Sequence, residues 1–254
     1  MEAPTSGSVL LAGLLLKLGG YGLIRVLLTI FSQATFFYLP LTDTLAIVSI
    51  IYASLTTIRQ IDMKRIIAYS SVAHMNLVVL GIFSCNTQGI AGAIFLMIAH
   101  GIVSSALFFL IGVVYDKYGT RIIYYYGGLV QVMPLFSLNL LFFCMANVGL
   151  PGTCNFIGEF VIFVGLVDRN FIILFFSVTG IVLSVLYTMF FCNRIIFGNL
   201  NINYIVVYKD MTFREFSTIL PLFIFTIILG FYPDLIFDTI LTSVSMNIEQ
   251  QKYL

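Results

Sequence analysis

Residues 8–31 read SVLLAGLLLKLGGYGLIRVLLTIF, and this stretch decides the class of fold. It is long enough to cross a bilayer, which takes roughly 20 mainly apolar residues. The whole chain shares this character, because 60% of it is hydrophobic, only 9% is charged and the mean hydropathy is +1.07. Soluble domains do not have such a composition. The sequence therefore predicts a membrane protein with several spans.

Lys17 interrupts this first apolar stretch. It stands about ten residues from the start, which is roughly 15 Å along a helix that rises ~1.5 Å per residue. An ammonium at that depth costs at least ~2.5–3.5 kcal/mol, so Lys17 has to face protein, water or a counter-charge. One interpretation is a structural ion-pair partner inside a helix bundle, and the other is a group that takes up and releases a proton. Because charges buried in membranes are mostly functional, the second is favoured.

The chain divides into about seven apolar segments, one of them broken. The predicted fold is an all-α polytopic membrane protein with about seven transmembrane helices, including one broken helix, and a C-terminal amphipathic helix. Residues 1–237 are expected to form the transmembrane domain and residues 238–254 an interfacial tail. The expected spans are residues 8–31, 39–58, 63–84, 89–115, 127–167, 171–197 and 216–237.

The positive charges predict how the chain is oriented. With seven spans, eight of the lysines and arginines that flank them fall on one side and three on the other. The positive side of a membrane protein faces the cytoplasm or the mitochondrial matrix. The N-terminus is therefore expected on that side and the C-terminal tail on the opposite side.

Residues 127–167 are too long for one helix and contain the break NVGLPGT at residues 147–153. Pro151 removes a backbone donor, and unpaired backbone at membrane depth is tolerated only where it lines protein or a polar cavity. Glu159 follows the break and is the only carboxylate expected well inside a span. It is either a structural partner for a buried cation or a carboxylate that carries a proton. Its position beside a broken helix, a device of transporters, favours the proton carrier.

His74 and His100 are the only two histidines of the chain, and both are expected near mid-depth. A lone buried histidine is more often a satisfied polar residue than a site. Lys17, His74, His100 and Glu159, however, come from four spans at one depth and are predicted to form a lateral polar row. Neutral histidine can relay protons. The four cysteines lack CxxC spacing, so no metal site is predicted, and the net charge of +1 argues against a nucleic-acid partner.

Several motifs carry a resemblance to a known family. They are EAPTSGS at residues 2–8, LLLKLGGYG at 14–22, DMKRIIAYSSVAHM at 62–75, IAHG at 98–101, GLPGT at 149–153, NFIGEF at 155–160 and GFYP at 230–233. In this order they resemble subunit 4 of NADH:ubiquinone oxidoreductase, respiratory complex I, over almost the whole chain. Only the second half of that antiporter-like subunit is matched.

The resemblance implies a site and a setting. Lys17 matches the family's lysine, Glu159 its glutamate on a broken helix, and His74 and His100 the histidines of the axis between them. The family is thought to move protons along this axis, driven by distant quinone reduction. The implied location is the mitochondrial inner membrane, with the N-terminus in the matrix and the C-terminus in the intermembrane space. No cofactor is expected on this chain, and NADH, FMN, iron–sulfur clusters and ubiquinone are expected on other subunits.

The resemblance also implies partners. They are the other membrane-arm subunits of complex I, membrane lipids and a separate chain, from a split gene, that supplies the missing first half. A truncated sequence is the alternative to a split gene. Two other functions stay open, a subunit of a multi-subunit Na⁺/H⁺ antiporter, which shares the fold, and a structural scaffold with relic charges. The stretch from EAP at residues 2–4 to Lys17 favours complex I, and the intact polar row disfavours the scaffold.

Overall fold

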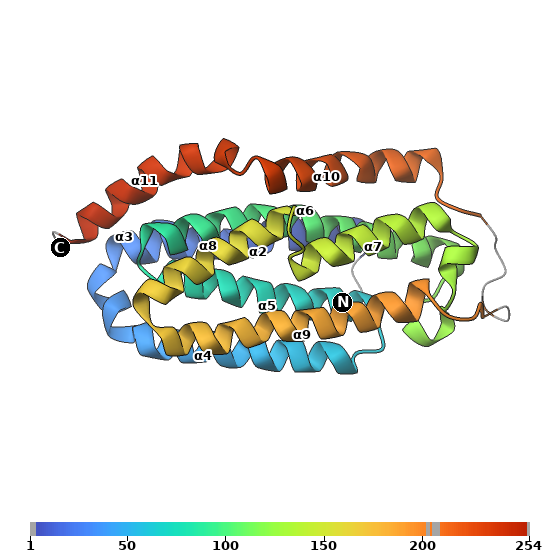
Figure 1. Ribbon diagram of the computed structural model, residues 1–254, viewed down its shortest axis with the longest axis horizontal. Coiled ribbons are helices and arrows are strands. Elements are labelled where there is room, and N and C mark those ends of the chain that lie inside the picture. The colour runs from blue at the N-terminus through green and yellow to red at the C-terminus, as the bar shows by residue number, and fades with distance from the viewer. Residues whose placement is uncertain (1–3, 202–203, 205–208, 253–254) are drawn as a thin grey trace.

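The computed structural model describes residues 4–201, 204 and 209–252, and its helices run mostly along one common axis (Figure 1). The first apolar stretch is helical, as predicted, but two of its turns are π-helical. A π turn widens the helix by one residue and is frequent at functional sites. Its parts are α1 Thr5–Leu10, η1 Leu11–Leu15, α2 Leu16–Gly22, η2 Leu23–Leu27 and α3 Leu28–Ile30.

The remaining helices follow with short connections. They are α4 Ser32–Arg59, α5 Met63–Phe83, α6 Thr87–Tyr118, α7 Pro134–Val148, α8 Cys154–Arg169, α9 Phe171–Ile196, α10 Phe213–Phe231 and α11 Asp234–Lys252. Two 3₁₀ turns, η3 Ile123–Tyr125 and η4 Leu129–Gln131, lie between α6 and α7. Within the described residues, six helices are long and apolar enough to span a bilayer, and α7 is a shorter apolar helix. Together, α7 and α8 form the predicted broken element, so the all-α multi-span fold is confirmed.

Some boundaries differ from the predicted ones. The second span begins at Ser32, not at residue 39, because a single residue, Phe31, breaks the helix ahead of it. The last two helices are divided at Tyr232 and Pro233, before the expected boundary at residue 238. Proline has no N–H with which to continue a helix, which explains this position.

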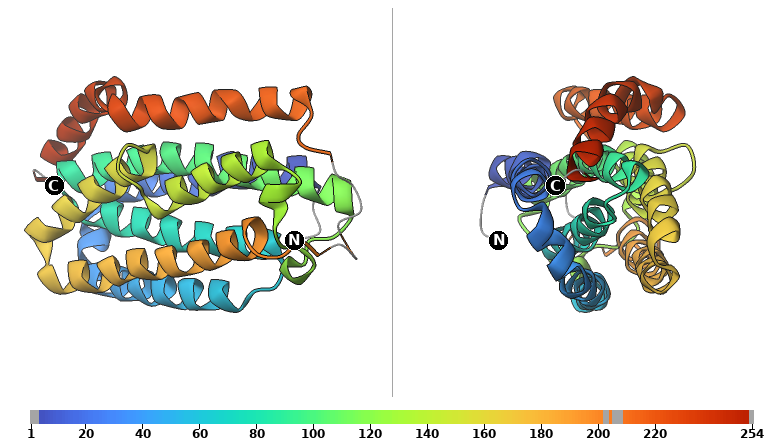
Figure 2. Two further views of the ribbon diagram at one scale, coloured as in Figure 1. Left: turned by 45° about the vertical axis from the view of Figure 1, so that its right-hand side comes forward. Right: turned by 90° about the vertical axis from the view of Figure 1, so that its left-hand side faces the viewer.

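The central helix of the bundle is α6, which packs against α5 and α8 (Figures 1 and 2). On one side α4 packs against α9, and on the other α10 and α11 form an outer layer. In the expected tail, Val244 of α11 is only 3% exposed and belongs to the hydrophobic core, and α11 packs against α6. This face of α11 therefore contacts the bundle, and the interfacial position of the rest stays a prediction.

The connections that carry most positive charges lie at one end of the bundle (Figure 2). At this end, a carboxylate that is far away in the sequence holds the start of α7. Asp210 accepts hydrogen bonds from the amides of Leu135 and Phe136 at 2.8 and 3.3 Å. These are the first amides of α7, which have no partner within the helix, and a negative charge there is stabilising. Lys117 donates to the Asp210 carbonyl at 2.9 Å. The end of α6 and the start of α7 are thus held to one segment.

Candidate functional site

The break between α7 and α8 brings a carboxylate against the backbone. Gly149 ends α7 with φ 84° and Gly152 has φ 92°, a conformation that favours glycine. Glu159 lies on the second turn of α8 and is 5% exposed. A Cβ on Gly149 would lie only 2.8 Å from Glu159 Oε2. The break therefore gives the carboxylate the space that it occupies.

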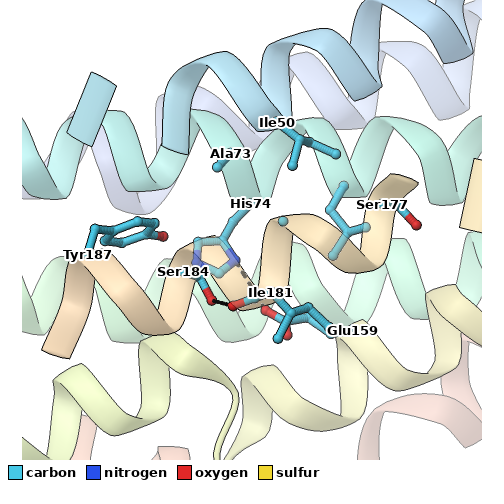
Figure 3. A pocket seen from close by; sticks show the side chains of 10 residues that line it. Ile50, Ala73, His74, Glu159, Ser177, Ile181, Ser184 and Tyr187 are labelled. Atoms are coloured by element: carbon cyan, nitrogen blue, oxygen red, sulfur yellow. Dashed lines mark hydrogen bonds and ion pairs between the residues drawn. The ribbon is translucent and has the colours of Figure 1, made fainter. Parts of the chain in front are cut away.

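His74 is the direct partner of this carboxylate. Its Nδ1 lies 3.2 Å from Glu159 Oε1, and both side chains are 6% exposed (Figure 3). His74 comes from the middle of α5 and Glu159 from α8, so two spans meet here. When Glu159 is ionised, Nδ1 of a neutral His74 has to carry the proton that it donates, which leaves Nε2 as an acceptor.

His100 of α6 extends the set. Its ring centroid lies 5.0 Å from that of His74, with the planes tilted by 33°. It is 1% exposed, and neither of its ring nitrogens has a hydrogen-bond partner among the described residues. The side chains of Ser104 and Asn155 are likewise buried and unpartnered. A buried polar group without a partner costs about 1–3 kcal/mol, so these atoms are suited to bind water.

Lys17 completes the row from the first helix. Its side chain is half-buried and its ammonium donates to the carbonyl of Ala12, within the first π-helical turn. The helix crosses α6 closely at Gly101, where a Cβ would lie 3.3 Å from the Gly13 carbonyl oxygen and 3.5 Å from Lys17 Cε. Because His100 is the neighbouring residue on α6, Lys17 and the imidazole of His100 lie close together.

The four residues singled out in the sequence therefore lie together, in the order Lys17, His100, His74 and Glu159. They come from four spans and cross the bundle sideways, as the sequence predicted. Their roles in proton transfer stay predictions. Within the described residues, no group of His, Cys, Asp and Glu side chains could hold a metal ion.

A second buried carboxylate was missed. Asp43 of α4 is 3% exposed and pairs with Arg169 at the end of α8, with Oδ2–Nη2 at 2.6 Å and Oδ1–Nη1 at 3.4 Å. Arg169 also donates to the carbonyl of Phe83 at the end of α5. Arg169 and Phe83 are the last residues of α8 and α5, so Asp43 lies at the level where these spans end, and the expectation that Glu159 is the only carboxylate well inside a span stays a prediction. The partners are 126 residues apart, and nothing in the sequence links them.

A family model described as "NADH:quinone oxidoreductase/Mrp antiporter, TM" matches residues 1–186. The chain belongs to this family of polytopic membrane proteins.

Individual relatives show which members of this family the chain resembles. The chain is 50% identical over 253 residues to NADH-ubiquinone oxidoreductase chain 4 of Marchantia polymorpha, covering 100% of this chain and 51% of that one. It is 53% identical over 233 residues to the protein of the same name from Chondrus crispus, covering 92% of this chain and 47% of that one. The chain thus spans about half the length of these curated relatives and corresponds to their C-terminal half.

Solved structures share the fold at lower identity. A chain of respiratory complex I from Thermus thermophilus superposes with a TM-score of 0.87 at 24% identity, over 92% of this chain and 50% of that one. A chain of the Mrp complex from Dietzia sp. DQ12-45-1b gives a TM-score of 0.88 at 18% identity, over 98% of this chain and 54% of that one. At these identities, the likeness supports the fold alone.

Proposed function

We propose that this chain is the second half of a proton-translocating membrane-arm subunit of respiratory complex I. The observation that carries the proposal is the buried row Lys17, His100, His74 and Glu159, which crosses the bundle beside a broken helix. Its curated relatives are named NADH-ubiquinone oxidoreductase chain 4. The chain performs no redox chemistry itself, and NADH, FMN, iron–sulfur clusters and ubiquinone belong to other subunits.

The row can move a proton in small steps. Glu159 and His74 exchange a proton over the 3.2 Å between Oε1 and Nδ1. A neutral histidine that gains a proton on one ring nitrogen can release the proton of its other ring nitrogen. His74 and His100 can therefore pass on a proton and return to the neutral form. The rings lie 5.0 Å apart, and both nitrogens of His100 lack a partner among the described residues, so a transfer between the rings requires a bridging water. The Lys17 ammonium ends the row beside His100.

The same relatives support a mitochondrial setting, and the sides of the termini and the separate first half are part of the proposal. The chain lies in the mitochondrial inner membrane, with its N-terminus in the matrix and its C-terminus in the intermembrane space. Other membrane-arm subunits surround it, and a separate polypeptide supplies the first half of the subunit. The side of the bundle with most positive charges faces the matrix, in accord with the positive-inside rule.

A second candidate function is a subunit of a multi-subunit Na⁺/H⁺ antiporter. The family model favours it, because the description of the model that matches residues 1–186 names the Mrp antiporter beside NADH:quinone oxidoreductase. The higher identity to the curated chain 4 relatives argues for complex I.

A native gel of the source membranes in mild detergent separates the two. Mass spectrometry locates this chain, and a stain for NADH oxidation identifies complex I. We expect the chain in a very large NADH-oxidising band, together with a polypeptide that resembles the missing first half. Migration in a smaller assembly without NADH oxidation would reverse the order of the two candidates.

A further inference from the structure

A small pocket lies beside His74 and Glu159. Its volume is about 20 Å³, and α4, α5, α8 and α9 enclose it. A cavity needs roughly 10–15 Å³ of this kind of space to hold one water molecule. The polar residues that line it are His74, Glu159, Ser177, Ser184 and Tyr187 (Figure 3). The pocket therefore has room for a single water and polar groups around it.

Two of these groups are buried and lack a partner. Tyr187 of α9 is 1% exposed, and its hydroxyl has no hydrogen-bond partner among the described residues. His74 Nε2 is also unpartnered, in a residue that is 5% exposed. Ser70 and Asn147 approach the Tyr187 hydroxyl, but not in hydrogen-bond geometry. Figure 3 shows His74 between Tyr187 and Glu159, with the tyrosine hydroxyl directed towards the histidine.

The donors and acceptors around the pocket are complementary to one water. With Glu159 ionised, Nε2 of His74 is an acceptor. Ser184 Oγ already donates to the carbonyl of Ile181 at 2.7 Å, so it too can only accept. Tyr187 has a hydrogen to donate. A water that receives from Tyr187 and donates to His74 and Ser184 makes three hydrogen bonds, the number typical of a buried water.

We propose that this pocket binds one water molecule between Tyr187, His74 and Ser184, and that Tyr187 is a positioning residue for His74. The bound water keeps Nε2 an acceptor and so keeps the proton of His74 on Nδ1, facing Glu159. Before each transfer, the proton of His74 therefore lies on Nδ1, the nitrogen that faces Glu159. This consequence for proton transfer rests on the proposed function, whereas the water site does not.

The site itself is tested by cryo-electron microscopy of the intact complex at a resolution that shows ordered waters. We expect a water peak within hydrogen-bond distance of the Tyr187 hydroxyl, His74 Nε2 and Ser184 Oγ. Tyr187→Phe keeps the ring and removes only the hydroxyl, so the peak should weaken or vanish. Ser184→Ala is the second variant and should have the same effect. A missing peak in the native complex, or an unchanged peak in both variants, overturns the water site.

The positioning role is tested by infrared spectroscopy of the resting complex. The Glu159 carboxylate band is the one that Glu159→Gln removes, and we expect Tyr187→Phe to shift it. We also expect coupled turnover to fall about fivefold, the equivalent of one lost hydrogen bond. Tyr52→Phe is the matched control, because Tyr52 of α4 is 68% exposed. If the Glu159 carboxylate band does not shift in Tyr187→Phe, the positioning role is overturned. Loss of pumping in Glu159→Gln would still support the proposed function, so the two failures are distinguishable.

Discussion

The Asp43–Arg169 pair and the row from Lys17 to Glu159 are both buried sets of charged and polar groups, but their hydrogen bonds differ. Both oxygens of Asp43 are bonded to Arg169, which also reaches the carbonyl of Phe83. In the row, both nitrogens of His100 and Nε2 of His74 lack partners among the described residues. A saturated pair fixes helices in place. A set with open donor and acceptor sites can bind water and exchange protons, so the saturation of the hydrogen bonds is what distinguishes the two regions.

The largest expected effect comes from removing one member of the saturated pair. Arg169→Leu leaves the Asp43 carboxylate buried and unpaired, which should cost about 3–5 kcal/mol and lower the yield of assembled complex. The measurement is the melting temperature of the purified complex and the amount of chain in it. In the double variant Asp43→Leu with Arg169→Leu no charge is left unpaired, and most of the stability should return. Equal losses in the single and double variants would contradict a structural pair.

A matched pair of amide substitutions compares the two regions directly. Glu159→Gln should leave assembly intact and reduce NADH-driven proton pumping at least about tenfold, because the amide cannot carry the proton. Asp43→Asn should impair assembly first, since the Arg169 charge loses its counter-ion. Both are measured by native gel and by proton uptake into vesicles. Normal pumping in Glu159→Gln would remove the row from the mechanism.

A smaller effect is expected where the break touches the row. Gly149→Ala places a methyl group 2.8 Å from Glu159 Oε2 in a residue with φ 84°. We expect a loss of about 1–3 kcal/mol and a several-fold lower turnover, as the carboxylate moves off His74. The control is Gly19→Ala, because a Cβ there would meet nothing within 4 Å. Identical turnover in both variants would show that the glycine is not needed for the carboxylate position.

The smallest effect concerns a saturated tyrosine, the counterpart of Tyr187. Tyr126 lies in the connection after α6 and donates to the Thr120 carbonyl at 2.8 Å, and burial raises its pKa from 10.0 to about 12. Between these values the unfolded chain loses the proton first, so stability should fall as pH rises above 10. Tyr126→Phe should cost about 0.5–1.5 kcal/mol at neutral pH and remove this pH dependence. Melting temperatures measured over a series of pH values check both predictions. If the variant loses stability above pH 10 as steeply as the native chain, that loss belongs to other groups.

Local patterns in the sequence were sufficient for part of the fold and site. Hydropathy located the spans, the glycines and proline of NVGLPGT located the break, and counting along each span put Lys17, His74, His100 and Glu159 at one depth. These inferences succeed because a membrane fixes helix length and direction, so position in the sequence converts to depth.

The other features of the fold and the site depend on which helices face each other, and the position of a residue in the sequence does not give this information. Asp43 and Arg169 each stand near the end of a span, where a charge looks like an ordinary interface residue. Tyr187 looks like one more aromatic residue of an apolar helix, and only the packing of α5, α8 and α9 places it beside His74. The start of α4 at Ser32 was missed because the break at Phe31 involves no glycine or proline.

The π-helical turns of the first helix have a consequence for its evolution. Each such turn is equivalent to the insertion of one residue into a regular helix, and one residue corresponds to a rotation of about 100°. The turn at Leu11–Leu15 lies directly before Lys17 and so sets the direction in which the lysine points. Because the π turn takes up one extra residue, a one-residue deletion there would restore a regular helix and leave the direction of the lysine nearly unchanged, whereas a deletion in a regular turn would rotate the lysine by about 100°. Along this helix the effect of a change in residue count therefore depends on its position, and the π-helical turns are the places where a single deletion can be absorbed without turning Lys17 away from the site.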